Sequence, residues 1–231
     1  MWNRSATESV DGSRSAAPIT FSETDFQQVD AHAAHTPFEV TYNIASLSDY
    51  LTSPFTSDSH KLRAIYFWVT HNISYDVQLH QSGVYGGQSA GSALRDRRAV
   101  CAGYADLFTD LARKAGLDVR TVYGGARGGP TRPGDTFFEP SSHAWNVVRI
   151  RSQYLFVDST WGAGHISGPT FTWQFEPHWF LVRPKHMIYS HFPMSPQDQY
   201  LSPPLDEQHF LDVPHVKPRA VDDHHVLDCV G

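Results

Sequence analysis

The stretch from Arg98 to Gly116 constrains the fold most, because it predicts one amphipathic helix with a cysteine at its start. From Tyr104 onward, apolar residues recur at positions 104, 107, 108, 111, 112 and 115, the spacing of a single buried helical face. Gly116 supplies a C-terminal stop, so we expect Cys101 in or just before the first turn. Unpaired N–H groups and the positive end of the helix dipole gather there and favour a thiolate. Gly103 would leave room beside the sulfur for a substrate backbone. The alternative is that Cys101 is a small core residue on the same face as Tyr104.

Composition narrows the function classes. The chain has 231 residues, 40% of them hydrophobic and 13% aromatic, which supports one sizeable core. The net charge of −6 and the lack of Lys/Arg runs argue against nucleic acid and anionic membranes as partners. No apolar stretch approaches the ~20 residues of a membrane span, and the first residues lack the apolar core of a secretory signal.

Only two cysteines are present, Cys101 and Cys229. They are too few for a disulfide scaffold and favour a reducing, cytoplasmic location. They also exclude a four-cysteine zinc site, although 14 histidines leave other metal sites open. His32 and His35 have a ligand-like spacing, but no third ligand is near, so we expect solvated side chains there.

Three regions are expected along the chain. Residues 1–40 are predicted to be a disordered or loosely ordered lead-in, because residues 1–20 are rich in Ser, Ala and Thr. Residues 41–200 are expected to form the folded domain of the chain. Residues 201–231 are expected to be a C-terminal extension broken by prolines, with a new apolar start near its end that suggests a truncated following region.

Within the domain, residues 58–72 predict a helix that begins at Ser57 or Asp58. A short strand is expected at 73–76. Residues 80–98 are polar and glycine-rich, which predicts a long loop that is either a wall of an active site or a surface connection.

Residues 119–123 alternate like a strand, and two further strands are predicted at 143–150 and 154–158. The short gap between the last two predicts an antiparallel hairpin. With a two-residue turn, His143 and Asp158 lie on one face of the sheet, opposite or diagonal to each other, whereas a three-residue turn would place them on opposite faces.

Residues 159–164 are predicted to form a tight glycine turn. The alternating aromatics at 171–175 are interpreted as core strands and not as a ligand cage.

A helix-start cysteine, a strand histidine and an aspartate on the next strand meet the requirements of cysteine acyl transfer. His143 would take the thiol proton of Cys101, and Asp158 would hold the other ring nitrogen and fix the tautomer. The Cys101 backbone N–H is a natural donor to an oxyanion. Gln88 is a candidate second donor and Gln81 a weaker one; the alternative for both is an ordinary surface amide.

Several blocks of the chain together resemble the transglutaminase-like superfamily, and more narrowly the kyphoscoliosis peptidase group with its related fungal cytokinesis regulators. These blocks are residues 61–69, 72–76, 100–105, 143–146 and 158–164, with further matches at 180–184 and 191–193. The resemblance covers about residues 45–200. It implies an α+β fold with a papain-like transglutaminase core, in which the nucleophile helix packs on an antiparallel sheet.

The resemblance also implies site roles. Cys101, His143 and Asp158 match the nucleophile, base and orienting acid. Supporting positions would be Trp145, Asn146, Trp161 and Gly162, with simple packing as the alternative for the two tryptophans. The chain lacks the acidic calcium loops of tissue transglutaminases and the cysteine-rich zinc module of the peptide N-glycanase branch, and its blocks fit arylamine acetyltransferases less well.

The function expected from these observations is cysteine-dependent cleavage or acyl transfer at protein or peptide amide bonds, through a thioester and without a cofactor or metal. Proteolysis is placed slightly ahead of cross-linking. The alternative is a non-catalytic transglutaminase-like scaffold in cytoskeletal organisation or cytokinesis, with cytoskeletal protein partners. A metal-binding role for the histidines is a third, weaker hypothesis.

Overall fold

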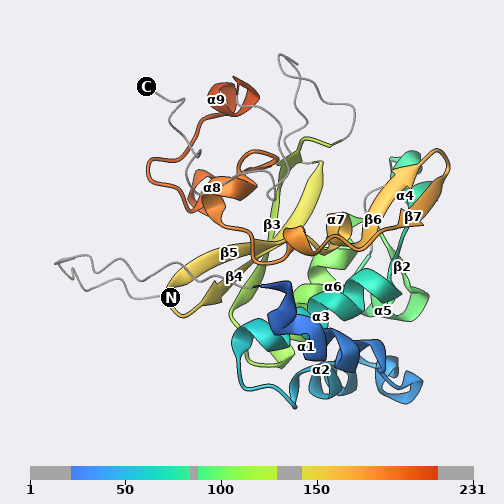
Figure 1. Cartoon of the computed structure of the whole chain (residues 1–231). Helices are drawn as coiled ribbons and strands as arrows, with labels where there is room; N and C mark the ends of the chain where they lie inside the picture. The colour runs from blue at the N-terminus through green and yellow to red at the C-terminus, as the bar shows by residue number, and fades with distance from the viewer. Residues whose placement is uncertain (1–21, 84–87, 129–141, 213–231) are drawn as a thin grey trace, which may run out of the picture.

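The computed structural model describes residues 22–83, 88–128 and 142–212, which form an α+β fold (Figure 1). Helices dominate the first half of the chain and strands the second. The elements, in chain order, are η1 (Glu23–Phe26), α1 (Gln27–Ala34), η2 (Phe38–Tyr42), α2 (Ile44–Thr52), α3 (Asp58–Asn72), β1 (Ser74–Tyr75), α4 (Val77–Ser82), α5 (Ala90–Asp96), β2 (Arg98–Ala99), α6 (Cys101–Lys114), β3 (Val119–Ala126), β4 (His143–Ile150), β5 (Gln153–Val157), α7 (Ser159–Ala163), β6 (Gly164–Ser167), β7 (Thr170–Trp173), η3 (Pro177–Trp179), α8 (Pro184–Met187), β8 (His191–Pro193), η4 (Pro196–Gln199) and α9 (Glu207–Asp212).

The main sheet is antiparallel, with the strand order β5-β4-β3-β8. Strands β4 and β5 form the predicted hairpin: Ile150 faces Gln153 and Asn146 faces Val157, so the turn contains two residues. Arg151 in this turn has a φ of +56°, as the tight turns that match strand twist require. This register confirms that His143 and the residue after β5, Asp158, share one face in a diagonal relation.

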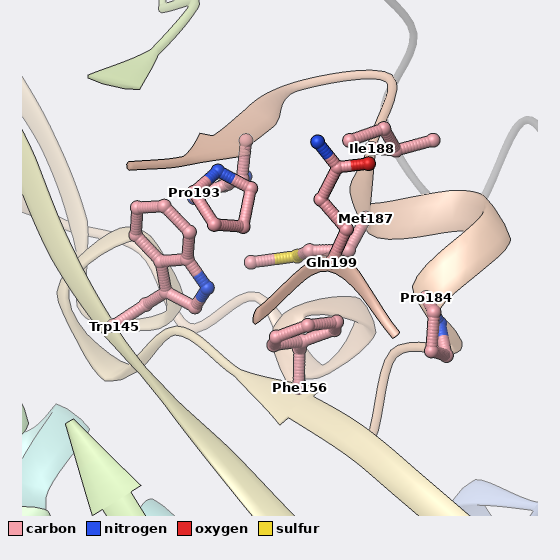
Figure 2. Close-up of a pocket in the computed structure, with 8 residues that line it drawn as sticks. Trp145, Phe156, Pro184, Met187, Ile188, Pro193 and Gln199 are labelled. Carbon is pink, nitrogen blue, oxygen red and sulfur yellow. The ribbon is translucent and has the colours of Figure 1, made fainter. Parts of the chain in front are cut away.

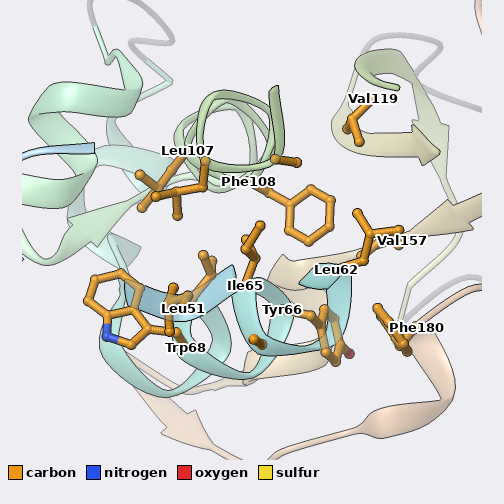
Figure 3. Close-up of a cluster of buried hydrophobic side chains, with 14 of the residues drawn as sticks. Leu51, Leu62, Ile65, Tyr66, Trp68, Leu107, Phe108, Val119, Val157 and Phe180 are labelled. Carbon is orange, nitrogen blue, oxygen red and sulfur yellow. The ribbon is translucent and has the colours of Figure 1, made fainter. Parts of the chain in front are cut away.

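One face of the sheet packs on α6, and α2 and α3 lie against α6 on its other side. Figure 3 shows Leu107 and Phe108 of α6 facing Ile65 of α3, with the Phe108 ring on the side toward the strand residue Val157. The α6 prediction is confirmed: the helix starts at Cys101, and Gly116 just beyond its end has a φ of +77°. The α3 prediction is also confirmed.

The chain beyond β7 covers the opposite face of the sheet. Figure 1 shows α8 and α9 on the side of the sheet away from α1 and α2. Trp145, Phe156 and Met187 belong to a second buried cluster there. Phe210 of α9, in the region expected to be an extension, is fully buried in a third cluster.

Part of the expected lead-in is ordered. In α1, Val29 and Ala33 are buried, and Asp30 forms a two-bonded ion pair with the buried Arg63 of α3, at 2.8 Å for both contacts. The expectation for residues 22–40 was wrong because Phe26, Val29 and Ala33 are buried in the main core, where α1 packs on α3. His32 also differs from the expected solvated side chain, since it stacks on Tyr50 at 4.6 Å. Residues 1–21 lie outside the described part.

Three other local predictions need correction. In place of the loop expected at 80–98, the described residues form the end of α4, all of α5 and the start of β2, because Asp76 and Ser89 cap the two helices through their side chains; residues 84–87 lie outside the described part. Residues 159–163 form α7 and not a glycine turn, since Asp158 caps that helix. Strand β7 lies at the edge of the core: Phe171 and the following Phe175 pack against the main cluster, as expected, whereas 48% of Trp173 is exposed. In the described residues, no helix has the length and apolar character needed to cross a membrane.

Candidate active site

Cys101 occupies the first turn of α6 and is only partly buried. Val100 precedes it in an extended conformation and caps the helix, so the Cys101 N–H lies among the donors that no helical carbonyl accepts. The His143 ring and the backbone N–H of Ala144 lie close enough to the thiol to lower its pKa through hydrogen bonding and charge. The predicted nucleophile and base, far apart in the chain, therefore lie beside each other.

His143 begins β4 and is 7% exposed. Its Nε2 lies 2.8 Å from Oδ2 of Asp158, which leaves Nδ1 as the nitrogen that faces the sulfur. Asp158 is fully buried. The structure thus brings together all three residues that the sequence singled out.

Asp158 also caps α7. Its Oδ1 accepts the backbone N–H groups of Thr160 at 2.9 Å and Trp161 at 3.0 Å. These bonds hold one oxygen on the helix and turn the other toward His143. The glycine-rich block after Asp158 is therefore helical because the Asp158 carboxylate caps its start.

Electrostatics favour the ion pair. Burial alone would lower the pKa of His143, but the charge and hydrogen bond of Asp158 and the contact with Cys101 raise it to about 10. Burial would raise the pKa of Asp158, but His143 and His191 hold it well below its usual range. Burial also opposes ionisation of Cys101, yet the His143 contact and the Ala144 N–H lower its pKa overall. These shifts favour an imidazolium at His143 and a carboxylate at Asp158 near neutral pH, and they make the Cys101 thiol easier to ionise.

Gln88 lies beside the first turn of α6. Its Oε1 accepts the backbone N–H of Val100 at 2.8 Å. A Cβ on Gly103 would be 2.7 Å from the Ala99 Cβ and 3.0 Å from that oxygen. Gly103 is buried and makes room for Ala99 and Gln88, so the prediction that it admits a substrate backbone was wrong. Gln81, the weaker candidate, is exposed on α4.

The two tryptophans pack around the imidazole. Trp145 is 1% exposed and stacks on His143 with ring centres 5.9 Å apart. The half-buried Trp161 lies 5.3 Å from the His143 ring and meets Trp179 edge-on at 5.0 Å. Because one is sealed and the other partly exposed, only Trp161 has a surface for a ligand.

Asn146 and Gly162 are structural neighbours of the site. Asn146 is fully buried on the α6 side of β4, where its Nδ2 donates to the Ala105 carbonyl at 2.9 Å and the Thr109 hydroxyl at 2.8 Å. It therefore fixes the nucleophile helix on the sheet. A Cβ on Gly162 would be 2.0 Å from the Tyr66 hydroxyl, so α7 can pack on α3 only because residue 162 is a glycine.

One polar residue of the site was not predicted. His191, on β8, is 1% exposed, and its Nε2 lies 3.0 Å from Oδ2 of Asp158. His143, Asp158 and His191 offer ligand atoms within 4.8 Å of one another, the only such group among the described residues. A lone histidine in an aromatic stretch gives no spacing signal, because the strand pairing that brings it in spans residues distant in sequence.

The comparisons with known proteins agree with this geometry. A model of the transglutaminase-like superfamily matches residues 45–159. The chain is 34% identical to the mouse kyphoscoliosis peptidase over 187 residues, which cover 80% of this chain and 28% of that protein. It is 31% identical to the human kyphoscoliosis peptidase over 211 residues, or 90% and 30% of the two chains. The chain thus spans less than a third of the length of these curated relatives.

A solved structure, the periplasmic domain of TgpA from Pseudomonas aeruginosa, is 21% identical with a TM-score of 0.41, over 58% of this chain and 47% of that one. The family match begins in α2 and ends at the first residue of α7, so it includes Cys101, His143 and Asp158. On this evidence, residues 45–159 are a domain of the transglutaminase-like superfamily.

Proposed function

We propose that this domain is a cysteine-dependent enzyme that cleaves or transfers the acyl group of protein or peptide amides. The observation that carries the proposal is the juxtaposition of the three side chains: His143 is bonded to Asp158 at 2.8 Å, and the same ring lies beside Cys101 and lowers the pKa of its thiol. A buried core cysteine would need neither an ionised imidazole beside it nor partial exposure.

The proposed reaction begins when the Cys101 thiolate attacks the amide carbonyl carbon and forms a C–S bond. The oxyanion is held by the Cys101 N–H and by a second donor, for which we propose the NH₂ group of Gln88. The side-chain oxygen of Gln88 already accepts a hydrogen bond from the backbone N–H of Val100, and this bond orients the Gln88 amide.

The His143 imidazolium then gives its proton to the leaving amine, the C–N bond breaks and a thioester remains. Neutral His143 next takes a proton from water, whose oxygen attacks the thioester; the C–S bond breaks, the carboxylic acid leaves, and Cys101 remains as a thiolate beside the His143 imidazolium. If a primary amine replaces water, the product is a new amide. We propose hydrolysis as the main outcome, in keeping with the name of the kyphoscoliosis peptidases.

The chain has only two cysteines, too few for a disulfide scaffold, and this favours a cytoplasmic location.

Alkylation tests the activated thiolate directly. In full-length protein at pH 6, iodoacetamide should modify Cys101 at least tenfold faster than Cys229, because an ordinary thiol with a pKa of about 8.5 is almost wholly protonated there. His143→Ala should remove this advantage. Equal rates for the two cysteines in folded wild-type protein would contradict the proposal.

Turnover distinguishes the two reactions. Wild-type protein and Cys101→Ala are incubated with an unfolded protein substrate and a fluorescent primary amine. New peptide termini without label indicate hydrolysis, and label in the substrate indicates transfer; neither should occur with Cys101→Ala. If Cys101→Ala kept the full biological function of the parent protein, the scaffold alternative would replace the enzyme.

A further inference from the structure

His191 lies in a buried polar cluster with His143 and Asp158 but takes no part in the proposed reaction. Its ring sits 5.4 Å from that of His143 and 4.9 Å from that of Trp145. The two histidines donate to the same oxygen of Asp158, at 2.8 Å and 3.0 Å. The carboxylate therefore accepts four hydrogen bonds in all, two on each oxygen.

The tautomer of His191 follows from its partners. An ionised carboxylate can only accept, so Nε2 must carry the proton that points to Asp158. The other nitrogen, Nδ1, lies 2.8 Å from the hydroxyl of Ser190. That hydroxyl also lies 3.3 Å from the carbonyl of Met187, but the shorter contact is with the ring. Ser190 thus fixes His191 much as Asp158 fixes His143, and the hydrogen-bonded chain runs Ser190, His191, Asp158, His143 and Cys101.

The backbone is built to bring His191 there. On β3, Gly124 faces His143 of β4 on one side and Pro193 of β8 on the other. A Cβ on Gly124 would be 2.2 Å from the Phe192 carbonyl and 2.6 Å from the Trp145 ring, so only glycine lets β8 approach this closely.

The surroundings keep His191 in place. Figure 2 shows Trp145, Phe156, Met187 and Pro193 around a narrow space that His191 also lines. This space has no room for a water molecule, so apolar side chains and not solvent border the imidazole on this side.

A metal ion fits the cluster less well than protons do. Imidazole and carboxylate ligands about 2.0–2.2 Å from one tetrahedral zinc would be roughly 3.3 Å apart. The observed Nε2–Oδ2 separations of 2.8 Å and 3.0 Å are hydrogen-bond lengths. The distances therefore indicate a network of hydrogen bonds and not a metal site.

We propose that His191 is a positioning residue of the active site, which holds the Asp158 carboxylate ionised and aimed at His143. This inference rests on the proposed function, because it assigns His191 to the same site. The titratable groups whose charge or hydrogen bonding reaches Asp158 are His143, His191, Cys101 and Tyr104. Among them, only the two histidines donate to the carboxylate in the described structure.

The test measures the rate of Cys101 alkylation by iodoacetamide from pH 4.5 to 9 in full-length Cys229→Ser protein. His191→Phe keeps a ring but removes the donor, and His191→Gln returns a donor of similar reach. Without the donor, the Asp158 carboxylate is less firmly aimed at His143 and holds the imidazolium less well beside the sulfur, so the pKa of the Cys101 thiol rises toward its usual value. Because a hydrogen bond to a charged group is worth about tenfold in an equilibrium constant, the rate of His191→Phe should fall about tenfold at pH 5 and less than twofold at pH 8.

His191→Gln should recover to within about threefold of the parent rate at pH 5. The matched control is His32→Phe, which alters a histidine that packs on an aromatic ring far from the site and should leave the profile unchanged. A His191→Phe profile that matches the parent, or a loss that is equal at every pH and follows the unfolded fraction, would overturn the proposal.

If His191→Phe does not fold, Ser190→Ala takes its place and should lower the rate at pH 5 but not at pH 8; an unchanged profile would then contradict the role of His191. The parent profile separately tests the proposed function: if Cys101 in the parent shows no enhanced rate at pH 6, the enzyme hypothesis fails whatever the variants do.

Discussion

Gly162→Ala should destabilise the domain strongly, although the change adds one methyl group. Gly162 lies in α7, directly after the residues that Asp158 caps. The new Cβ would sit 2.0 Å from the Tyr66 hydroxyl oxygen and 2.6 Å from the ring carbon that bears it. Ordinary contact begins at 3.4 Å, so one element must move by more than an ångström.

The cost can be estimated from what that movement breaks. Tyr66 is fully buried, and its hydroxyl donates to the Glu176 carbonyl at 2.7 Å. Overpacking of a tight core costs about 1–3 kcal/mol. A buried hydrogen bond that is lost adds about 1–2 kcal/mol. The expected total is about 2–5 kcal/mol, a large fraction of the ~5–15 kcal/mol that stabilises a typical domain.

Chemical denaturation followed by tryptophan fluorescence measures this loss. The matched control is Gly91→Ala, because Gly91 is exposed in α5 and a Cβ there would meet only the Ser89 hydroxyl, at 3.9 Å. That variant should gain about 0.5–1 kcal/mol, since alanine loses less backbone entropy in a helix.

A double-mutant cycle with Tyr66→Phe tests the cause. Removing the hydroxyl relieves the 2.0 Å contact but leaves the ring carbons at 2.6 Å and 2.9 Å, so the cost of Gly162→Ala should fall by about 1 kcal/mol or more and not vanish. A Gly162→Ala protein within about 0.5 kcal/mol of wild type would refute the reasoning.

Three further predictions concern the site. Turnover should hold to about pH 9 and fall with a midpoint near pH 10, because His143 must be charged to protonate the leaving amine. The raised pKa of His143 should also stabilise the fold fully below about pH 6.5, and this stabilisation should be lost as the pH rises through about 10. Unfolding experiments at a series of pH values would measure this loss. Gln88→Ala should lower kcat by about 10–1000-fold with little change in KM, whereas Gln81→Ala should match wild type in the same assay. Asn146→Ala should cost about 2–3 kcal/mol in a denaturation experiment and leave the pH profile of the folded fraction unchanged, since Asn146 holds α6 on the sheet and does not touch the reacting atoms.

The parts of the fold that the sequence predicts correctly are those governed by local periodicity. The apolar repeat that begins at Tyr104 gives α6 its buried face, and the short gap between residues 150 and 153 allows only a tight hairpin. With a two-residue turn, the relation of His143 and Asp158 follows from the hairpin, because side chains alternate along strands; the place of Cys101 beside them depends on how α6 packs on the sheet. The α+β class and the superfamily were predicted on the same residues and are confirmed.

The parts that the sequence did not predict depend on contacts across the fold. Residues 22–40 have little apolar surface, but Arg63 supplies Asp30 with a buried partner that no local pattern reveals. Gly103 suggested an opening for a substrate backbone, but Ala99 and the Gln88 side chain occupy the space that a side chain at position 103 would need. His191 could not be assigned, because its role arises only when β8 joins the sheet.

The site therefore depends on one feature of the sheet, its register, more than on any single catalytic side chain. A slip of one residue between β4 and β5 would turn Asp158 to the α6 face, away from His143. Several structural devices oppose such a slip: the Asn146 bonds to α6, the Asp158 cap on α7, and the second imidazole on the same carboxylate. Each of them satisfies a buried polar group that would otherwise cost stability. Because the same bonds fix the register and orient the carboxylate, a substitution that weakens the site should also weaken the fold, and the two effects separate only in the pH profile of the cysteine.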